Sequence, residues 1–425
     1  MTSPGHVLIV GASAAGLSTA EALRRLGHEG RLTLVDAEPH LPYDRPPLSK
    51  QVLAGAWEPA RAQLRSAAQL DALAAEFVRG EPAVALDAAE RTVTTASGRV
   101  LRADAVVVAT GLTPHRLPGQ DGLAGVHVLR GLDDALTLRA RLTAGTRLVV
   151  VGEGVLGAEL AATARTMGLE VTLVGMGRTL LREQLGDMVG GLLTRAHTER
   201  GVRLRLGVAV AELTGIDDQL DVAVDEPAGT DRRLGVVVDE LTGAGGRVTG
   251  VRLATGELLP ADAVVVAVGS RPSTGWLTGS GLTLGDGVEC DARCRAAEGV
   301  YAVGDVASFE HAGLGRRLRL ENRTNATEQA QVVAANLLGA DRPYTPIPYF
   351  WTDQYDIKIQ AHGLPAPAAE VTIAEGDPEQ HRFAAVYREG GQITGVLGWN
   401  MPKQARLLRQ RLLGTWQPTP PLTPA

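Results

Sequence analysis

Two glycine-rich turns in the sequence have the composition of a pyrophosphate-binding loop. The first is Gly11-Ala-Ser-Ala-Ala-Gly16 and the second is Gly152-Glu-Gly-Val-Leu-Gly157, and each stands between an apolar run and a helix-like stretch. Such a turn lets the backbone approach a pyrophosphate, whose charge then lies at the amino end of the helix. In the first turn Ser13 replaces the middle glycine and adds a hydroxyl donor. One turn alone could be an ordinary strand-to-helix connection, but two of them predict two dinucleotide sites.

Acidic residues occur at positions where they could bind a ribose and the ribityl chain of a dinucleotide cofactor. Asp36 or Glu38 follows the first turn by about 20 residues and is placed to accept from a ribose hydroxyl. A third motif, Gly299-Val-Tyr-Ala-Val-Gly-Asp305, is an apolar strand that ends in Gly-Asp. Asp305 could cap a helix, or it could bind the ribityl chain of a flavin. Beside two dinucleotide-binding units, we favour the flavin.

An internal duplication supplies the elements that position these turns. Each half contains a strand, a glycine turn, a helix and a second strand. The segments are 7–10, the helix to Leu26 and 32–35 in the first half, and 148–151, the helix to about Met167 and 171–174 in the second. Nearly identical strands recur later, at 103–111 before Pro114 and at 261–269 before Pro272. Short apolar strands separated by helices predict an α/β fold with two Rossmann-like dinucleotide-binding domains.

The rest of the chain predicts a further domain. After about residue 339 the sequence becomes aromatic and alternating, as at 383–387 and 393–397, and then forms a basic helix over 402–413, so we expect a C-terminal α+β domain. The segment 217–256 predicts an extra hairpin. The expected boundaries are 1–112 and 269–338 for the two parts of an FAD-binding domain, 113–268 for an NAD(P)H-binding domain, 339–416 for the C-terminal domain and 417–425 for a disordered tail.

Bulk composition limits the class of protein. The chain has 425 residues, a net charge of −6 and two cysteines. The acidic balance argues against a nucleic-acid binder. We see neither a membrane-spanning apolar run nor a leader before His6, so we expect a cytoplasmic protein. Two cysteines are too few for a disulfide framework, and no spacing suggests a metal site.

The sequence resembles a family of flavoproteins along nearly its whole length. It is similar to the bacterial FAD-dependent NAD(P)H:ferredoxin and rubredoxin reductases that serve oxygenases, the putidaredoxin-reductase-like members of the glutathione-reductase-like flavoproteins. The most specific match is Pro42-Tyr-Asp-Arg-Pro-Pro-Leu-Ser-Lys50, which resembles the segment that this family lays against the isoalloxazine ring. Paired prolines fix φ and make this loop a preformed wall.

The resemblance implies roles for three side chains. Lys50 would lie near flavin N5, where a cation stabilises negative charge on the reduced ring. Glu159, which we place on the first turn of its helix, would pair with Lys50, although a first-turn glutamate is also favoured by the helix dipole. Trp351 would cover the flavin and relay electrons, or fill core.

The motifs and the resemblance together give the expected binding residues. Those for FAD are Gly11, Ser13, Ala15, Gly16, Asp36, Glu38, Arg45, Pro46, Lys50, Ala83, Ala109, Thr110, Gly111, Arg130, Gly304, Asp305, Arg323 and Trp351. Those for the nicotinamide nucleotide are Gly152, Gly154, Leu156, Gly157, Glu159, Arg178 and Gly269.

The choice of nucleotide depends on the residues after the strand 171–174. NADH enzymes usually place an acid there for the adenosine ribose, but here Val174 is followed by Gly175-Met-Gly-Arg178. Arg178 could instead meet a 2′-phosphate. We therefore expect both NADH and NADPH to be accepted.

The expected acceptor is a small acidic iron–sulfur ferredoxin. A hydride carries two electrons and a ferredoxin takes one, and a flavin bridges the two. Redox cysteines are missing from 45–50, and we expect Cys290 and Cys294 to be buried and inert. Rubredoxin reductase, NAD(P)H oxidase and apoptosis-inducing-factor-like signalling protein stay open as alternatives. Two basic clusters could orient the ferredoxin: Arg316, Arg317, Arg319 and Arg323 in one, and Lys403, Arg406 and Arg409 in the other.

Overall fold

The first nucleotide-binding unit is built on a six-stranded sheet. In the computed structural model, which describes residues 3–215 and 246–413, its order is β20-β21-β7-β1-β2-β3. All neighbouring pairs are parallel except β20 with β21. The strands are β1 His6–Val10, β2 Arg31–Asp36, β3 Glu76–Arg79, β7 Ala105–Val108, β20 Arg295–Ala297 and β21 Val300–Ala302. Buried aliphatic side chains on β1, β2 and β7 form its core, as expected of a parallel sheet covered on both faces.

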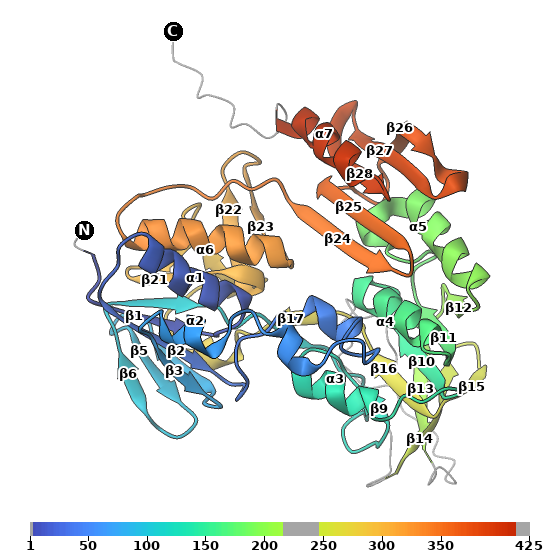
Figure 1. Cartoon of the computed structure of the whole chain (residues 1–425), viewed down its shortest axis with the longest axis horizontal. Coiled ribbons are helices and arrows are strands. Elements are labelled where there is room, and N and C mark those ends of the chain that lie inside the picture. Colours follow the sequence, from blue (N-terminus) through green and yellow to red (C-terminus); the bar gives the residue numbers. More distant parts are fainter. Residues whose placement is uncertain (1–2, 216–245, 414–425) are drawn as a thin grey trace.

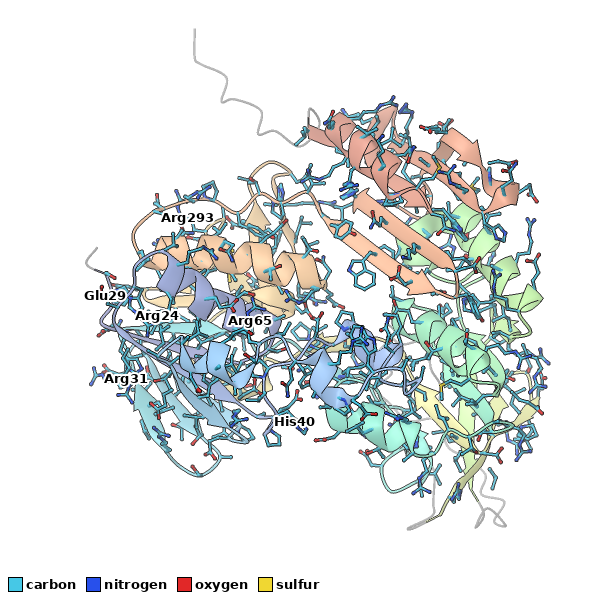
Figure 2. The ribbon with its side chains drawn as sticks, in the orientation of Figure 1. Arg24, Glu29, Arg31, His40, Arg65 and Arg293 are labelled. Carbon is cyan, nitrogen blue, oxygen red and sulfur yellow. The ribbon has the colours of Figure 1, made fainter. Side chains whose placement is uncertain are left out.

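Helices and smaller sheets cover this unit. The helices α1 Ala14–Arg25 and α6 Arg323–Leu337 pack against each other although they lie far apart in the sequence (Figure 1). Arg24 donates to the carbonyl oxygens of Leu73 and His28 and so fixes the far end of α1 (Figure 2). The smaller strands are β4 Ala83–Asp87, β5 Thr92–Thr95 and β6 Val100–Arg102 in one sheet, and β18 Leu284–Gly285, β19 Gly287–Cys290, β22 Ala307–His311 and β23 Arg316–Leu318 in another.

The second unit repeats the first. Its five-stranded sheet has the order β12-β11-β10-β16-β9 and is parallel throughout. The elements are β9 Val126–His127, α3 Leu132–Arg139, β10 Arg147–Val151, α4 Val155–Thr166, β11 Glu170–Gly175, α5 Arg182–Glu199, β12 Arg203–Leu206 and β16 Ala263–Val266. The pairing of Val10 with Val35 in the first unit corresponds to that of Val151 with Val174 in the second. The expected α/β fold with two Rossmann-like units is confirmed.

An antiparallel sheet extends the second unit. It contains β13 Val210–Gly215, β14 Val248–Leu253 and β15 Leu258–Pro260. Most of the hairpin that we expected over 217–256 lies outside the described residues, as does the tail 417–425.

Two strands join the units where the chain crosses between them. β8 Leu112–Pro114 leaves the first unit, β17 Ser270–Pro272 returns to it, and the two pair antiparallel. Thr110 donates its hydroxyl to the carbonyl oxygen of Ser273, which adds a second connection. The glycine that recurs after the two similar strands therefore directly precedes each crossover strand, and the recurring proline ends it.

The C-terminal unit is an antiparallel sheet with one helix. The sheet has the order β24-β25-β28-β27-β26, and α7 Pro402–Leu413 packs on β25 and β28. Its strands are β24 Tyr349–Gln354, β25 Ile357–Gly363, β26 Glu370–Asp377, β27 Arg382–Glu389 and β28 Gln392–Trp399. The stacked rings of Phe383 and Trp399 are buried in a hydrophobic core that this unit shares with the second unit. β24 also contacts α4, so this unit lies against the second one (Figure 1).

The remaining elements are short. They are α2 Ala67–Asp71 and the 3-10 helices η1 Pro46–Ser49, η2 Pro59–Ala62, η3 Gly275–Leu277, η4 Gly304–Val306 and η5 Pro378–Gln380. Within residues 3–215 and 246–413, none of the helices has both the length and the apolar character needed to cross a membrane.

Candidate functional site

The first glycine turn is held by close backbone contacts. Gly11 has a φ of +104°. A Cβ at Gly11 would lie 2.7 Å from the carbonyl carbon of Ala109, which directly follows β7. A Cβ at Gly16 would lie 3.0 Å from the carbonyl carbon of Gly11. Ser13 is the N-cap of α1, and its hydroxyl is 3.5 Å from the carbonyl oxygen of Tyr43. Glycine is therefore required at both ends of this turn.

Asp36 holds the turn against the end of β2. Its Oδ2 accepts from the backbone N–H of Ala12 at 2.5 Å, and its Oδ1 accepts from that of Glu38 at 2.8 Å. Burial raises the pKa of Asp36, and these two N–H donors oppose the rise. Asp36 and Glu38 both line a small pocket at the turn, so the structure keeps both as candidate ribose ligands.

A charged cluster closes that pocket. Arg45 Nη2 lies 2.7 Å from Glu38 Oε1, and Tyr43 donates its hydroxyl to Glu38 Oε2. Burial would raise the pKa of Glu38, but Arg45 and Tyr43 together hold it below its ordinary value. His40, which is labelled in Figure 2, also lines the pocket. Its Nε2 lies 2.9 Å from Oδ1 of Asp133 on α3.

The Gly-Asp motif lies against the start of α1. Gly304 has a φ of +79°, and a Cβ there would lie 2.9 Å from Cβ of Ala15. The N-cap of η4 is Val303, so Asp305 does not cap that helix. The nearest cation to its carboxylate is Arg130, with Nη2 3.7 Å from Oδ2, and no hydrogen bond reaches the carboxylate from the described part of the chain. Burial raises the pKa of Asp305, and Arg130 opposes the rise.

Other predicted residues surround these two motifs. Arg45 donates to the carbonyl oxygen of Arg130 at 2.8 Å, and a Cβ at Gly111 would lie 2.9 Å from Arg130 Nη2. Arg323, the first residue of α6, pairs with Asp44 at 2.9 Å and so holds the loop that precedes η1. Ala83 stands at the start of β4, half-buried against the first core.

The centre of the site is a buried ion pair between the two nucleotide-binding units. Lys50 Nζ lies 2.5 Å from Glu159 Oε2, and the two side chains are only 11% and 8% exposed. Ser49 donates to Oε2 of the same carboxylate at 2.8 Å, and Thr352 of β24 donates to its Oε1 at 2.8 Å. Lys50 Nζ is also 5.3 Å from the ring centre of Trp351. The predicted pairing is therefore present, and all three units contribute to it.

One local expectation about Glu159 is wrong. The helix α4 begins at Val155, so Glu159 is its fifth residue and lies on the second turn. The helix dipole acts mainly within the first turn, so it does not explain this position. The position of Glu159 is explained instead by its contacts with Lys50, Ser49 and Thr352.

The second glycine turn repeats the first, with one acidic side chain that the sequence did not lead us to consider. Gly152 has a φ of +120°, and a Cβ at Gly157 would lie 2.9 Å from the carbonyl carbon of Gly152. Gly154 is the N-cap of α4 and Leu156 is half-buried. Glu153 Oε1 accepts from the backbone N–H of Gly177 at 2.9 Å.

Two other predicted nucleotide ligands lie near this turn. Arg178 is exposed, and Gly269, with a φ of +88°, follows β16 as Gly111 follows β7.

Comparison with known proteins identifies the family. Residues 5–231 and 226–330 match the pyridine nucleotide-disulphide oxidoreductase family, and residues 349–421 match the reductase C-terminal family. The chain belongs to the pyridine nucleotide-disulphide oxidoreductase family. It is 32% identical to rhodocoxin reductase of Rhodococcus erythropolis over 98% of this chain and 91% of that protein.

Two further similarities lie within this oxidoreductase family. The ferredoxin reductase component of chlorobenzene dioxygenase from Cupriavidus sp. is 36% identical over 96% of this chain and 93% of that protein. Among solved structures, the covalent complex of putidaredoxin reductase with putidaredoxin matches with a TM-score of 0.85 and 30% identity, over 97% of this chain and 94% of that one. The chain is therefore an oxidoreductase that uses FAD and a pyridine nucleotide.

The residues present fit FAD. The close-packed turn at Gly11 and Gly16 leads directly into the amino end of α1, where a pyrophosphate can bind. The Asp305 carboxylate is half-buried and has no hydrogen-bond donor among the described residues, so it suits the hydroxyls of a ribityl chain. Bound FAD supplies a ring that accepts a hydride and releases electrons singly. Lys50 places a cation in the junction of the three units, and Glu159 holds that cation in position.

The cysteines take no part in this site, despite the family name. Cys290 and Cys294 are both buried, in and after β19. Burial raises the pKa of the Cys294 thiol to about 12, while Gln329 donates to its sulfur. Thiols held in this protonated state are poor nucleophiles. The expectation that both are buried is confirmed.

The first predicted basic cluster is largely neutralised. Arg317 lies near Glu289 and Glu310, and Arg319 pairs with Asp286 at 2.9 Å. Arg323 pairs with Asp44, as described above. Of the four arginines, Arg316 alone is exposed and lacks a salt bridge within the described ranges.

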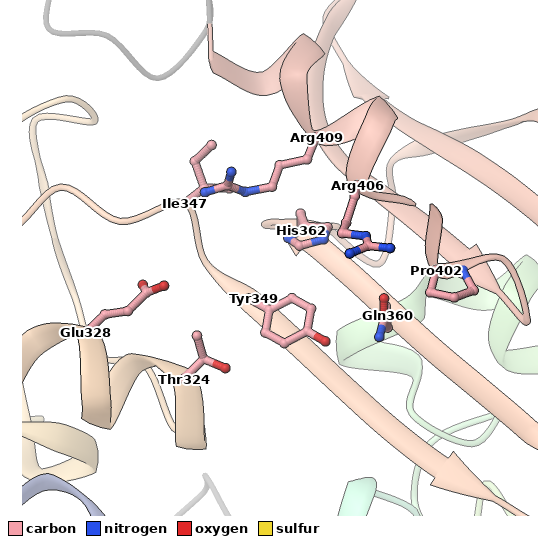
Figure 3. Close-up of a pocket in the computed structure, with 9 residues that line it drawn as sticks. All are labelled: Thr324, Glu328, Ile347, Tyr349, Gln360, His362, Pro402, Arg406 and Arg409. Atoms are coloured by element: carbon pink, nitrogen blue, oxygen red, sulfur yellow. The ribbon is translucent and has the colours of Figure 1, made fainter. Parts of the chain in front are cut away.

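Two of the three residues of the second basic cluster, Arg406 and Arg409, line a cavity of about 540 Å³ between α6 and the C-terminal unit, whereas Lys403 is exposed and does not line it. Glu328 of α6 lies on one side, and Arg406 and Arg409 of α7 lie on the other (Figure 3). Neither arginine forms a hydrogen bond or salt bridge with another described residue. Burial raises the pKa of Glu328, and Arg409 opposes the rise. Tyr349, two residues before Trp351 on β24, also lines this cavity.

Proposed function

We propose that this oxidoreductase is a ferredoxin reductase of an oxygenase system. It takes a hydride from a nicotinamide nucleotide at the second glycine turn, and its FAD passes electrons singly to a small acidic iron–sulfur ferredoxin. The observation that carries the proposal is the Lys50–Glu159 pair beside Trp351, at the junction of two nucleotide-binding units and without a cysteine pair. The relatives named as ferredoxin reductase components of dioxygenase systems support it.

The ferredoxin docks, in this proposal, over the cavity beside α7. Arg406 and Arg409 are cations without a paired acid among the described residues, in a chain whose net charge is −6. Tyr349 and Trp351 belong to one strand and lie on the same face of it, because side chains two residues apart share a face. An acidic partner held at the cavity would thus be close to the strand that carries Trp351.

Carrier-dependent oxidation of NAD(P)H is the decisive experiment. The purified holoenzyme is given NADH or NADPH with a ferredoxin, a rubredoxin or no carrier, and nucleotide oxidation and carrier reduction are followed together. A ferredoxin reductase reduces the ferredoxin fastest. Faster reduction of the rubredoxin would instead support a rubredoxin reductase. Rapid NAD(P)H oxidation without a carrier would support an oxidase. A long-lived charge-transfer complex with very slow turnover would support an apoptosis-inducing-factor-like protein.

Two further parts of the proposal concern organisation and location. We place the domain boundaries at 1–112 with 269–338, 113–268 and 339–416, and the membership of the three main sheets supports them. We place the protein in the cytoplasm, since its two cysteines stay free thiols in a reducing compartment.

A further inference from the structure

The two glycine turns differ in where they carry their acid. In the first unit Asp36 is the last residue of β2, directly after Val35, and Ala12 follows Gly11 in the turn. In the second unit the residue that corresponds to Asp36 is Gly175, since Val174 pairs with Val151 as Val35 pairs with Val10. The residue that corresponds to Ala12 is Glu153. The acid is thus missing from the strand end and present in the turn.

The carboxylate of Glu153 takes the place that the carboxylate of Asp36 has in the first unit. Asp36 Oδ1 accepts from the N–H two residues after the strand end, that of Glu38, at 2.8 Å. Glu153 Oε1 accepts from the corresponding N–H, that of Gly177, at 2.9 Å. A side chain from the strand end in the first unit and a side chain from the turn in the second therefore bring a carboxylate to equivalent positions.

The glycines opposite Glu153 make room for it. A Cβ at Gly175 would lie 2.6 Å from Cβ of Glu153, and one at Gly177 would lie 2.8 Å from Glu153 Oε1. Gly175 has no left-handed φ, so its backbone conformation does not require glycine. The absence of a side chain there is explained by the space that Glu153 fills.

One oxygen of Glu153 is free to bind a ligand. Its Oε2 accepts no hydrogen bond from a described residue, and the side chain is half-buried without a salt bridge inside 3–215 and 246–413. Arg178 is exposed and forms no salt bridge with the described residues, so it does not neutralise Glu153.

We infer that Glu153 binds the adenosine ribose hydroxyls of NADH and makes the enzyme select NADH over NADPH. A carboxylate accepts hydrogen bonds from the two ribose hydroxyls, and it repels a 2′-phosphate at the same place. The inference rests on the proposed function only in that the nucleotide binds at the second turn. It replaces the expectation that both nucleotides are accepted, because that expectation assumed that no acid was present.

The test compares the two nucleotides with ferricyanide as acceptor, so that the result is independent of any ferredoxin. The wild-type holoenzyme should have a clearly higher kcat/KM for NADH than for NADPH. Glu153→Gln keeps the shape and an acceptor for Gly177 but removes the charge. We expect it to lower the NADH-to-NADPH ratio by about tenfold to a hundredfold, the range for a lost hydrogen bond to a charged group. Equal use of the two nucleotides by the wild type, or an unchanged ratio in Glu153→Gln, would overturn the inference.

Binding without turnover gives a second readout. Calorimetric titration of the oxidised holoenzyme with NAD⁺ and with NADP⁺ should show the same loss of discrimination in Glu153→Gln. The double variant Glu153→Gly with Gly175→Asp moves the acid to the strand end, where the first unit has Asp36, and should recover the preference for NADH. Arg178→Ala tests the rival assignment of selection to the arginine, and it should leave the NADH-to-NADPH ratio unchanged. A preference that follows Arg178 instead of Glu153 would assign nucleotide selection to the arginine and refute the role of Glu153.

Discussion

Replacing Lys50 by Met tests whether the buried ion pair serves the flavin or only the fold. The change keeps most of the side-chain length but removes the cation 2.5 Å from Glu159 Oε2. Glu159 is 8% exposed, so its charge would be left in the interior with Ser49 and Thr352 as donors. Removal of one partner of a buried pair costs about 3–5 kcal/mol. We expect Lys50→Met to lower the free energy of unfolding by about 3 kcal/mol, because two hydrogen bonds to the carboxylate remain.

This loss is large enough to measure in a melting experiment. At about 2–4 °C per kcal/mol for a cooperative unit of roughly 150–250 residues, the apparent melting temperature of the holoenzyme should fall by at least about 6 °C. The double variant Lys50→Met with Glu159→Gln removes both charges and should recover most of this loss. Reduction of the flavin should stay slow in both variants, because neither places a cation in the junction.

Single-turnover flavin reduction by NADH, with FAD content measured on the same samples, separates the two roles. We expect Lys50→Met to slow reduction much more than it weakens FAD binding. If reduction in Lys50→Met proceeds at the wild-type rate, Lys50 has no part in the chemistry. Recovery of both stability and reduction in the double variant would show that the pair acts only on structure.

Three other predictions follow from the same geometry. Asp305→Ala should yield protein without FAD, seen as loss of the yellow flavin absorbance, and full FAD occupancy would remove Asp305 from the site. Reduction of an acidic ferredoxin should slow about tenfold or more in Arg406→Glu, and also in the wild type when the ionic strength rises above about 0.1 M. The control Arg25→Glu should change the rate of ferredoxin reduction little, because Arg25 follows Arg24 in the last turn of α1, away from the C-terminal unit (Figure 2). Burial lowers the pKa of His197 and of His362 to about 4. Below about pH 6.5 the unfolded chain therefore binds more protons at these rings than the folded protein does, and the free energy of unfolding should fall as the pH drops toward about 4. A flat melting temperature over that range would contradict the burial of these rings.

Features that depend on neighbouring residues could be predicted from the sequence. The basic helix was expected over 402–413 and is observed over Pro402–Leu413, because apolar spacing and a proline at the first helical position are local signals. Both glycine turns were likewise predicted, since left-handed and close-packed positions such as Gly11 and Gly152 require glycine.

Charge partners from distant parts of the chain could not be predicted. Arg317, Arg319 and Arg323 form a dense cluster in the sequence, but they pair with acids that lie earlier in the chain, at Glu310, Asp286 and Asp44. A count of local charge therefore overestimated the basic surface near the Gly-Asp motif. Of the two arginines of α7 that line the cavity, Arg406 is exposed and Arg409 is half-buried, and no acidic side chain of the described chain forms a salt bridge with either.

The same reasoning explains why Glu153 was overlooked. A search for a ribose ligand follows the chain to the end of the second strand, where Gly175 stands, and concludes that the acid is absent. In space, however, the turn and the strand end are adjacent, as the hydrogen bond from Ala12 to Asp36 shows in the first unit. A carboxylate can therefore reach the same place from either segment. The sequence did contain a signal: relative to the first unit, the second has an acid at 153 in place of Ala12 and a glycine at 175 in place of Asp36. This exchange becomes visible once the two units are aligned by their strand register.

The C-terminal unit completes the charge arrangement of the site as well as covering it. Thr352 donates to Glu159, Gln354 donates to Thr352 at 3.1 Å, and the ring of His197 on α5 lies 2.7 Å from Gln354 Oε1. This chain of hydrogen bonds runs through the interior and fixes β24 against α4 and α5 of the second unit. Since Trp351 is the neighbour of Thr352 on β24, the contact that orients Glu159 also fixes the strand that carries Trp351. The position of the carboxylate beside Lys50 and the position of the aromatic ring are thus set by one strand, which neither glycine turn could have indicated.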